Sequence, residues 1–170
     1  MKDLIFCQRE IPKEKWRYGL RSSAATGCGW IATYNALMLM GYSPDPEKLI
    51  RVYERMVPGV HGNIGTMSLA PAVFFMRQGF AVEYLSVTEQ FDKVAKESDV
   101  SVLFYYWRKG LRFGAHFVAL RYTPEGFVGY NTYRNSNGPD YYGESLSGFL
   151  KQRSYFGAVL IGIRDKKCEK

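Results

Sequence analysis

The chain has 170 residues, of which 46% are hydrophobic, and its formal net charge is +7. This length and apolar content predict one folded domain spanning residues 1–170 and exclude an intrinsically disordered protein. Three cysteines without a CxxC pair, together with only two histidines, argue against a disulfide scaffold and a zinc ribbon, so we expect no metal and no cofactor.

The hydropathy of the chain bears on where the protein is located. The first apolar run, Leu-Ile-Phe-Cys, has four residues, whereas a signal peptide needs about 7–15 apolar residues. No stretch approaches the ~18 apolar residues of a transmembrane helix. We therefore expect a cytoplasmic protein without a membrane partner, in a reducing compartment where free thiols persist. The sequence leaves the oligomeric state open.

Helices are predicted in the first half of the chain. Residues 28–40 carry apolar side chains with the helical period of 3.6 residues, which predicts a helix with one buried stripe. The Asp45-Pro46 step is typical of a helix start and predicts a second helix, through about residue 56. The Gly-rich segment 58–65 predicts a loop, and a third helix is expected over about 66–78.

Strands dominate the second half of the chain. β-branched and aromatic residues predict strands, in chain order, over 80–85, 100–107, 115–122, 127–133 and 155–164. Short helices are expected at 88–97 and 144–151. The segment Thr-Pro-Glu-Gly at 123–126 predicts a turn. Helices followed by a mostly antiparallel sheet predict an α+β fold in which the N-terminal helices pack on the sheet.

Cys28, in the segment Thr-Gly-Cys-Gly-Trp, is the candidate nucleophile. At the N-terminal edge of the first predicted helix, its thiol faces unpaired backbone N–H groups and the positive end of the helix dipole. Both stabilise a thiolate, which favours a reactive thiol. A small buried cysteine that packs against the core is the alternative, and Cys28 alone does not decide between the two.

His116 is the candidate base, and Asn131 is the candidate group that orients it. A nucleophilic cysteine needs a base within hydrogen-bond reach, and the base needs a third group to hold its ring. If a two-residue turn joins their strands, paired residue numbers sum to 249, and both side chains lie on one face of the sheet. A core histidine is the alternative interpretation of His116, and Asp140 is the second candidate for the orienting group.

These motifs resemble the papain-like cysteine peptidases, in particular the branch that processes bacteriocin leader peptides. The resemblance lies in the helix opening Thr-Gly-Cys-Gly-Trp, the strand Ala-His-Phe-Val-Ala-Leu, and an Asn fifteen residues after the His. It implies a papain-like fold and a triad of Cys28, His116 and Asn131 that attacks a peptide or amide bond. The family places an oxyanion-donating Gln several residues before the nucleophile. Here the candidate donors are Ser22, six residues before Cys28, and Gln8, if its segment folds back.

Two other functions stay open. A papain-like domain that has lost turnover and binds peptides is motivated by the missing upstream Gln. A nucleic-acid-binding domain is motivated by the net charge and by segment 104–113, where aromatic residues precede three cations. That order favours a buried strand ending in an exposed basic turn, so we expect no nucleic-acid partner. The remaining histidine and cysteines are expected to have no chemical role: His61, Cys7 and Cys168.

Overall fold

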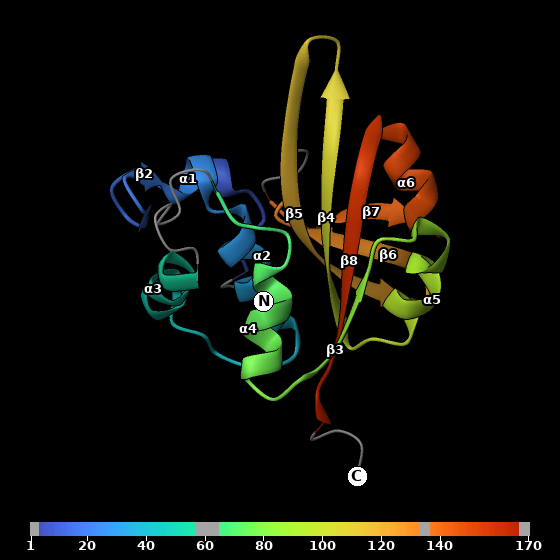
Figure 1. Ribbon diagram of the computed structural model, residues 1–170, viewed down its shortest axis with the longest axis horizontal. Helices are drawn as coiled ribbons and strands as arrows, with labels where there is room; N and C mark the ends of the chain where they lie inside the picture. Colours follow the sequence, from blue (N-terminus) through green and yellow to red (C-terminus); the bar gives the residue numbers. More distant parts are fainter. Residues whose placement is uncertain (1–3, 57–64, 133–136, 167–170) are drawn as a thin grey trace.

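The structure of the chain is a computed structural model, which describes residues 4–56, 65–132 and 137–166. It confirms the predicted α+β class: a six-stranded sheet has helices on both faces (Figure 1). The helices are α1 (Ser23–Thr26), α2 (Cys28–Leu39), α3 (Pro46–Met56), α4 (Ala70–Arg77), α5 (Phe91–Lys96) and α6 (Leu146–Gln152), with short 3-10 helices η1 (Gln8–Glu10) and η2 (Thr88–Gln90). No helix in the described ranges is long and apolar enough to cross a membrane.

Every pairing in the large sheet is antiparallel, and the strand order is β3-β8-β4-β5-β6-β7. The strands are β3 (Ala81–Leu85), β4 (Val100–Lys109), β5 (Arg112–Thr123), β6 (Gly126–Tyr130), β7 (Asp140–Gly143) and β8 (Tyr155–Arg164). A separate two-stranded sheet is formed by β1 (Arg17–Tyr18) and β2 (Arg21–Ser22). Strands β1, β2 and β7 were not predicted from the sequence, because each is too short to show an alternating pattern.

The sheet separates two hydrophobic clusters, because strand side chains alternate between its faces. Phe104 and Phe117, directly paired across β4 and β5, belong to the cluster on the side of α2, α3 and α4. Leu103 and Val118, the next pair, belong to the cluster that includes residues of α5 and α6. The face on which a β5 residue lies therefore follows from its register with β4.

The helix α2 is buried all round, which corrects the prediction of a single buried stripe. Each residue from Gly29 to Leu37 is buried. A helix that is apolar on every side belongs inside a core, and α2 lies between the sheet and the other N-terminal helices (Figure 1). The second helix begins as predicted, because Oδ1 of Asp45 accepts hydrogen bonds from the backbone N–H groups of Glu47 and Lys48. The third helix begins at Ala70, later than expected.

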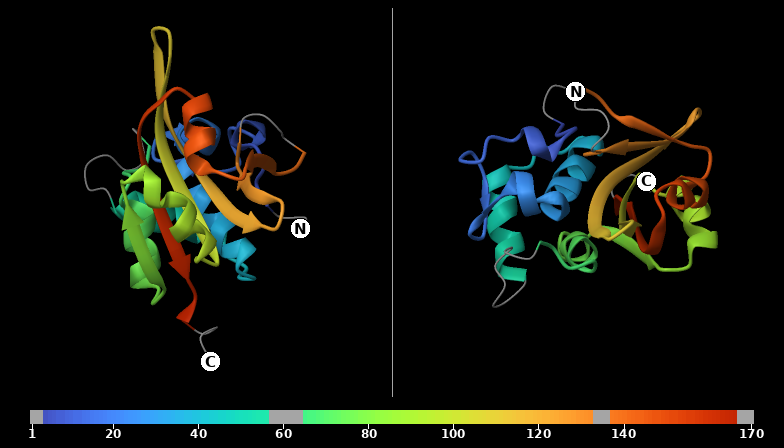
Figure 2. Two further views of the ribbon diagram at one scale, coloured as in Figure 1. Left: turned by 90° about the vertical axis from the view of Figure 1, so that its right-hand side faces the viewer. Right: turned by 90° about the horizontal axis from the view of Figure 1, so that it is seen from above.

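The hairpin of β4 and β5 extends well beyond the other strands (Figures 1 and 2). Its register runs from Ser101↔Leu120 to Lys109↔Arg112 and leaves a turn of two residues, Gly110 and Leu111. Gly110 has a φ of +61°, a conformation that glycine adopts without steric cost. Two residues singled out in the sequence, His61 and Cys168, lie outside the described residues, as does most of the Gly-rich loop.

Candidate active site

Cys28 is the first residue of α2, as predicted, and its sulfur meets backbone amides. The backbone amides of Phe117, Gly29 and Cys28 lie close enough to the thiol to favour its ionised form. The first of these belongs to β5, so the sulfur lies where the N-terminus of α2 meets the sheet. The residue as a whole is half-buried. The structure thus brings together a helix N-terminus, a strand edge and a thiol.

The thiol is nevertheless protonated at neutral pH, which corrects the expected stabilisation of a thiolate. Burial of the thiol raises the pKa of Cys28 to about 11, although the three amides oppose this shift. An anion loses its hydration when it is buried, and here that loss outweighs the amide dipoles. The side chain of Cys28 is therefore a neutral thiol at rest.

The two glycines that flank Cys28 are packing positions. A Cβ on Gly27 would lie 2.6 Å from the carbonyl oxygen of Ser23. A Cβ on Gly29 would lie 2.4 Å from the side chain of Thr66. Since a real Cβ does not approach other atoms so closely, glycine is required here for the protein to pack against itself. Packing within the protein thus accounts for both glycines of the Gly-Cys-Gly step, and close approach of a substrate is not needed to explain them.

The imidazole of His116 is buried and neutral. Its side chain is 1% exposed, and its Nε2 lies 2.7 Å from the backbone carbonyl oxygen of Asn131. Because a carbonyl oxygen only accepts, Nε2 carries the proton, and the basic atom of the neutral ring is Nδ1. Burial lowers the pKa of His116 to about 4, against the opposing effect of the hydrogen bond to Asn131.

Asn131 does hold His116, but through its backbone and not through its side chain. The β5–β6 register runs from Ala119↔Tyr130 to Thr123↔Gly126, so paired numbers sum to 249 and the two-residue turn is confirmed. Asn131 follows directly after β6 and has a φ of +67°. Asp140, the second candidate, pairs with Gly129 on the far side of β6.

The side chain of Asn131 is bound to Gln8 instead. Its Oδ1 accepts a hydrogen bond of 2.9 Å from the Gln8 backbone N–H, and its Nδ2 donates a bond of 3.0 Å to Gln8 Oε1. Both residues are almost fully buried. The Gln8 amide also donates from Nε2 to the carbonyl oxygen of Ala24, at 3.2 Å. The N-terminal segment thus folds back to the site, which the sequence allowed but did not require.

Of the two candidate oxyanion donors, Gln8 is the one brought to the site. Ala24, which accepts a hydrogen bond from its amide, lies in α1, four residues before Cys28. Ser22 lies at the start of α1, where its side chain makes no capping bond. No described hydrogen bond joins Ser22 to Cys28.

Cys28 and His116 approach the same edge of β5 from different sides. His116 pairs with Tyr105, whose side chain belongs to the cluster near α5 and α6. Cys28 packs against the cluster on the other face, and its sulfur reaches the N–H group of Phe117, the residue after His116. Within the described residues, no hydrogen bond joins this sulfur to the imidazole. Only the His116–Asn131 contact of the expected triad is formed.

The comparisons with known proteins add no relative. No family model matches this chain, and no curated protein matches it. The part of the chain that the structure describes contains no group of three or more His, Cys, Asp or Glu side chains able to hold a metal ion. The function of the protein is therefore inferred from the geometry around Cys28 and His116.

The buried imidazole makes the stability of the protein depend on pH. An unfolded His titrates near pH 6.5, whereas His116 titrates at about 4, so its contribution to stability is full above pH 6.5 and is lost as pH falls from 6.5 through 4. Between pH 7 and pH 5 the free energy of unfolding is expected to fall by roughly 2 kcal/mol from this group. Urea unfolding at both pH values measures the fall.

The matched variant is His116→Gln, which has no titrating ring. Its stability should change less between pH 7 and pH 5 than that of the wild type. Equal changes in the two proteins would show that His116 is not the group responsible.

Proposed function

We propose that this chain is a cysteine-nucleophile hydrolase of peptide or amide bonds with a papain-like fold, in which Cys28 is the nucleophile and His116 the base. One observation carries the proposal. The thiol at the N-terminus of α2 lies beside the backbone amide of Phe117, the residue after His116, while the carbonyl of Asn131 holds the ring of His116 through Nε2. The papain-like family that the sequence resembles has the same order of Cys, His and Asn along the chain. It also has the cysteine at the start of a helix and the histidine at the start of a strand.

The charge states favour a mechanism in which attack and proton transfer are coupled. Because the thiol and the imidazole are both neutral at pH 7, the resting site in this proposal has no thiolate–imidazolium pair. As Cys28 Sγ forms a bond to the acyl carbon, its proton passes to Nδ1 of His116, a step that requires the two side chains to meet at the edge of β5. That proton then goes to the departing amine as the C–N bond breaks, which leaves a thioacyl-enzyme for water to hydrolyse.

Two donors are available to the oxyanion in this proposal. The first is the backbone N–H of Cys28, at the start of α2. The second is the remaining N–H of the Gln8 amide, whose other bond goes to Ala24. Gln8 would then replace the upstream Gln of the family from a different place in the sequence. Loss of one such donor typically lowers a rate by about 10²–10³.

The edge of β5 supports an extended peptide as the substrate. In the described pairs, β6 accompanies β5 only as far as Ala119. Further along this edge, the N–H of Phe117 points at Cys28, and Ala115, the next residue with the same orientation, is exposed. A peptide that added itself as a strand along this edge would carry its main chain past the thiol.

Cleavage of a proteome-derived peptide library tests the proposal. New peptide ends, identified by mass spectrometry, are expected with the wild type and with Cys7→Ser, which keeps both Cys28 and His116. Cys28→Ala and His116→Gln should produce none, because each removes one partner of the proton transfer. Cleavage by Cys28→Ala at the wild-type rate would contradict the proposal.

A peptide-binding domain without turnover is the second candidate. It is favoured by the weakly acidic thiol and by the absence, within the described ranges, of a hydrogen bond between Cys28 and His116. In that case the wild type and Cys28→Ala would retain the same library peptides on a column and cleave none of them.

A further inference from the structure

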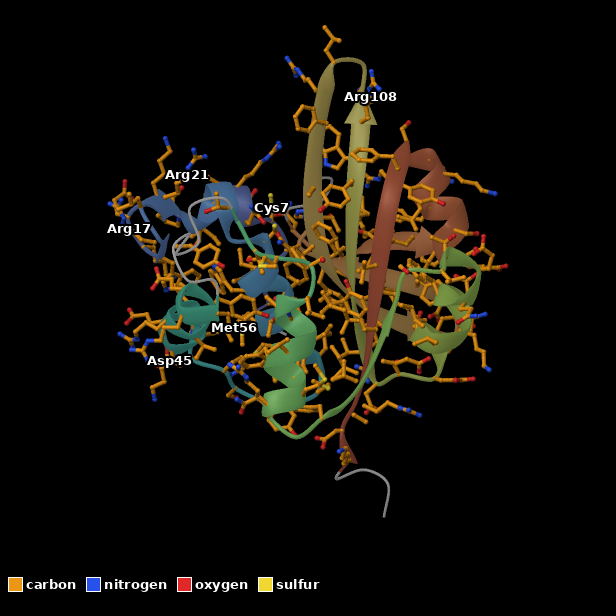
Figure 3. The ribbon with its side chains drawn as sticks, in the orientation of Figure 1. Cys7, Arg17, Arg21, Asp45, Met56 and Arg108 are labelled. Carbon is orange, nitrogen blue, oxygen red and sulfur yellow. The ribbon has the colours of Figure 1, made fainter. Side chains whose placement is uncertain are left out.

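The tip of the β4–β5 hairpin exposes two large apolar side chains. Leu111 is 95% exposed and Phe113 is 79% exposed. They lie at the end of the element that extends furthest from the molecule, where Arg108 is labelled in Figure 3. We refer to Leu111 and Phe113, together with the adjacent cations Arg108, Lys109 and Arg112, as the hairpin apex.

The apex is basic on both faces of the hairpin. Arg108 pairs with Phe113 and lies on its face, whereas Lys109 and Arg112 pair with each other on the opposite face. All three cations are exposed. Residues 100–124 contain no Asp or Glu that could neutralise them. The apolar tip is therefore surrounded by positive charge, which favours an anionic partner.

The apex is held out by contacts within the hairpin and with β8. Trp107 packs over Gly114, where a Cβ would lie 2.7 Å from its ring. The backbone N–H of Arg108 donates to Ser154, and its Nε donates to the carbonyl oxygen of Gly110. Exposure of the apolar side chains is thus a property of a braced turn, so the partner meets a preformed surface.

We propose that the hairpin apex binds the surface of a membrane that contains anionic phospholipids, without spanning the membrane. Leu111 and Phe113 enter the boundary between headgroups and acyl chains, and the three cations contact lipid phosphates. Contact of this kind requires no spanning helix, so it is compatible with the finding that none of the described helices could cross a membrane. It departs from the expectation of no membrane partner, which considered only spanning segments.

The other anionic partner, single-stranded nucleic acid, fits the apex less well. Base stacking needs open aromatic faces beside the cations. The hairpin apex offers a single open ring, that of Phe113, because its most exposed side chain, Leu111, has no ring. The nearby rings of Tyr106 and Phe156 stack on one another, with centroids 5.5 Å apart. A second copy of this basic chain would bring like charges together. An anionic lipid surface satisfies both the apolar tip and the cations around it.

Sedimentation of the full chain with vesicles tests the proposal. Binding is expected to vesicles of phosphatidylcholine with phosphatidylglycerol at low salt, and not to phosphatidylcholine alone. At about fivefold per cation near an anionic surface, the triple variant Arg108→Gln, Lys109→Gln, Arg112→Gln should bind roughly 100-fold more weakly. Leu111→Ser with Phe113→Ser should weaken binding by at least tenfold, because the tip no longer enters the lipid.

The β1–β2 turn provides a matched control. Leu20 there is 78% exposed and is flanked by Arg17 and Arg21, which lie far from the hairpin apex (Figure 3). Leu20→Ser and the double variant Arg17→Gln, Arg21→Gln should bind vesicles like the wild type. No binding to anionic vesicles, or equal losses in the control variants, would overturn the proposal. So would binding of a single-stranded oligonucleotide that depends on the apex when vesicle binding does not.

Discussion

Alkylation of Cys28 by iodoacetamide is expected to accelerate about tenfold for each unit of pH between pH 7 and pH 10. The thiolate is the reactive species, and burial raises the pKa of Cys28 to about 11. Only about one thiol in 10⁴ is then ionised at pH 7, and the ionised fraction grows in proportion to hydroxide concentration. The total acceleration over three units is roughly 1,000-fold.

The measurement uses a chain in which Cys28 is the sole thiol, obtained with Cys7→Ser and Cys168→Ser, and intact-mass spectrometry. The shape of the profile should be the same in His116→Gln, because the imidazole is neutral throughout this range. A rate that is already high at pH 7 and stays flat to pH 9 would indicate a thiolate–imidazolium pair instead. That outcome would contradict the neutral resting state and the coupled proton transfer derived from it.

Removal of the Asn131 side chain is expected to destabilise the protein strongly. Asn131→Ala leaves the backbone N–H and the Oε1 of Gln8 without their partner, at a position where both residues are buried. Each unsatisfied buried group costs about 1–3 kcal/mol. We therefore expect the free energy of unfolding to fall by roughly 3–5 kcal/mol, measured by urea denaturation at pH 7.

Two companion variants separate the causes. Asn131→Gly loses the same hydrogen bonds but adopts the φ of +67° more easily, so it should be less destabilised than Asn131→Ala. Gln8→Ala removes the two side-chain bonds, to Asn131 and to Ala24, but keeps the backbone N–H of residue 8. A loss below about 0.5 kcal/mol in Asn131→Ala, within the range of ordinary surface substitutions, would show that this network does not hold the N-terminal segment.

The β5–β6 hairpin shows how much of the site follows from local sequence. The turn at residues 123–126 fixes the register, and the register fixes the face on which residues near His116 and Asn131 lie. Both steps depend on near neighbours in the chain, so counting residues predicts them. The start of α2 at Cys28 is local in the same sense, because it follows from apolar periodicity after a Gly-rich step.

The roles of individual atoms at Asn131 are not local. Its side chain could have bound His116, but the left-handed backbone turns its carbonyl to the imidazole, and its amide meets Gln8, 123 residues away in the sequence. Likewise, segment 104–113 predicts a strand and a basic turn, but not that the turn extends beyond the other strands. Exposure of Leu111 depends on where the rest of the chain packs.

The three cysteines and two histidines also show which properties are local and which depend on tertiary structure. Residue types, helix start and strand order single out Cys28 and His116, because these are properties of neighbouring residues. The charge states of both side chains were decided by tertiary structure, since burial depends on what packs around each group. Burial reverses the local effect of the helix N-terminus on Cys28 and keeps His116 neutral. The sequence by itself therefore determined which residues could react, whereas only the packing decided their protonation at neutral pH.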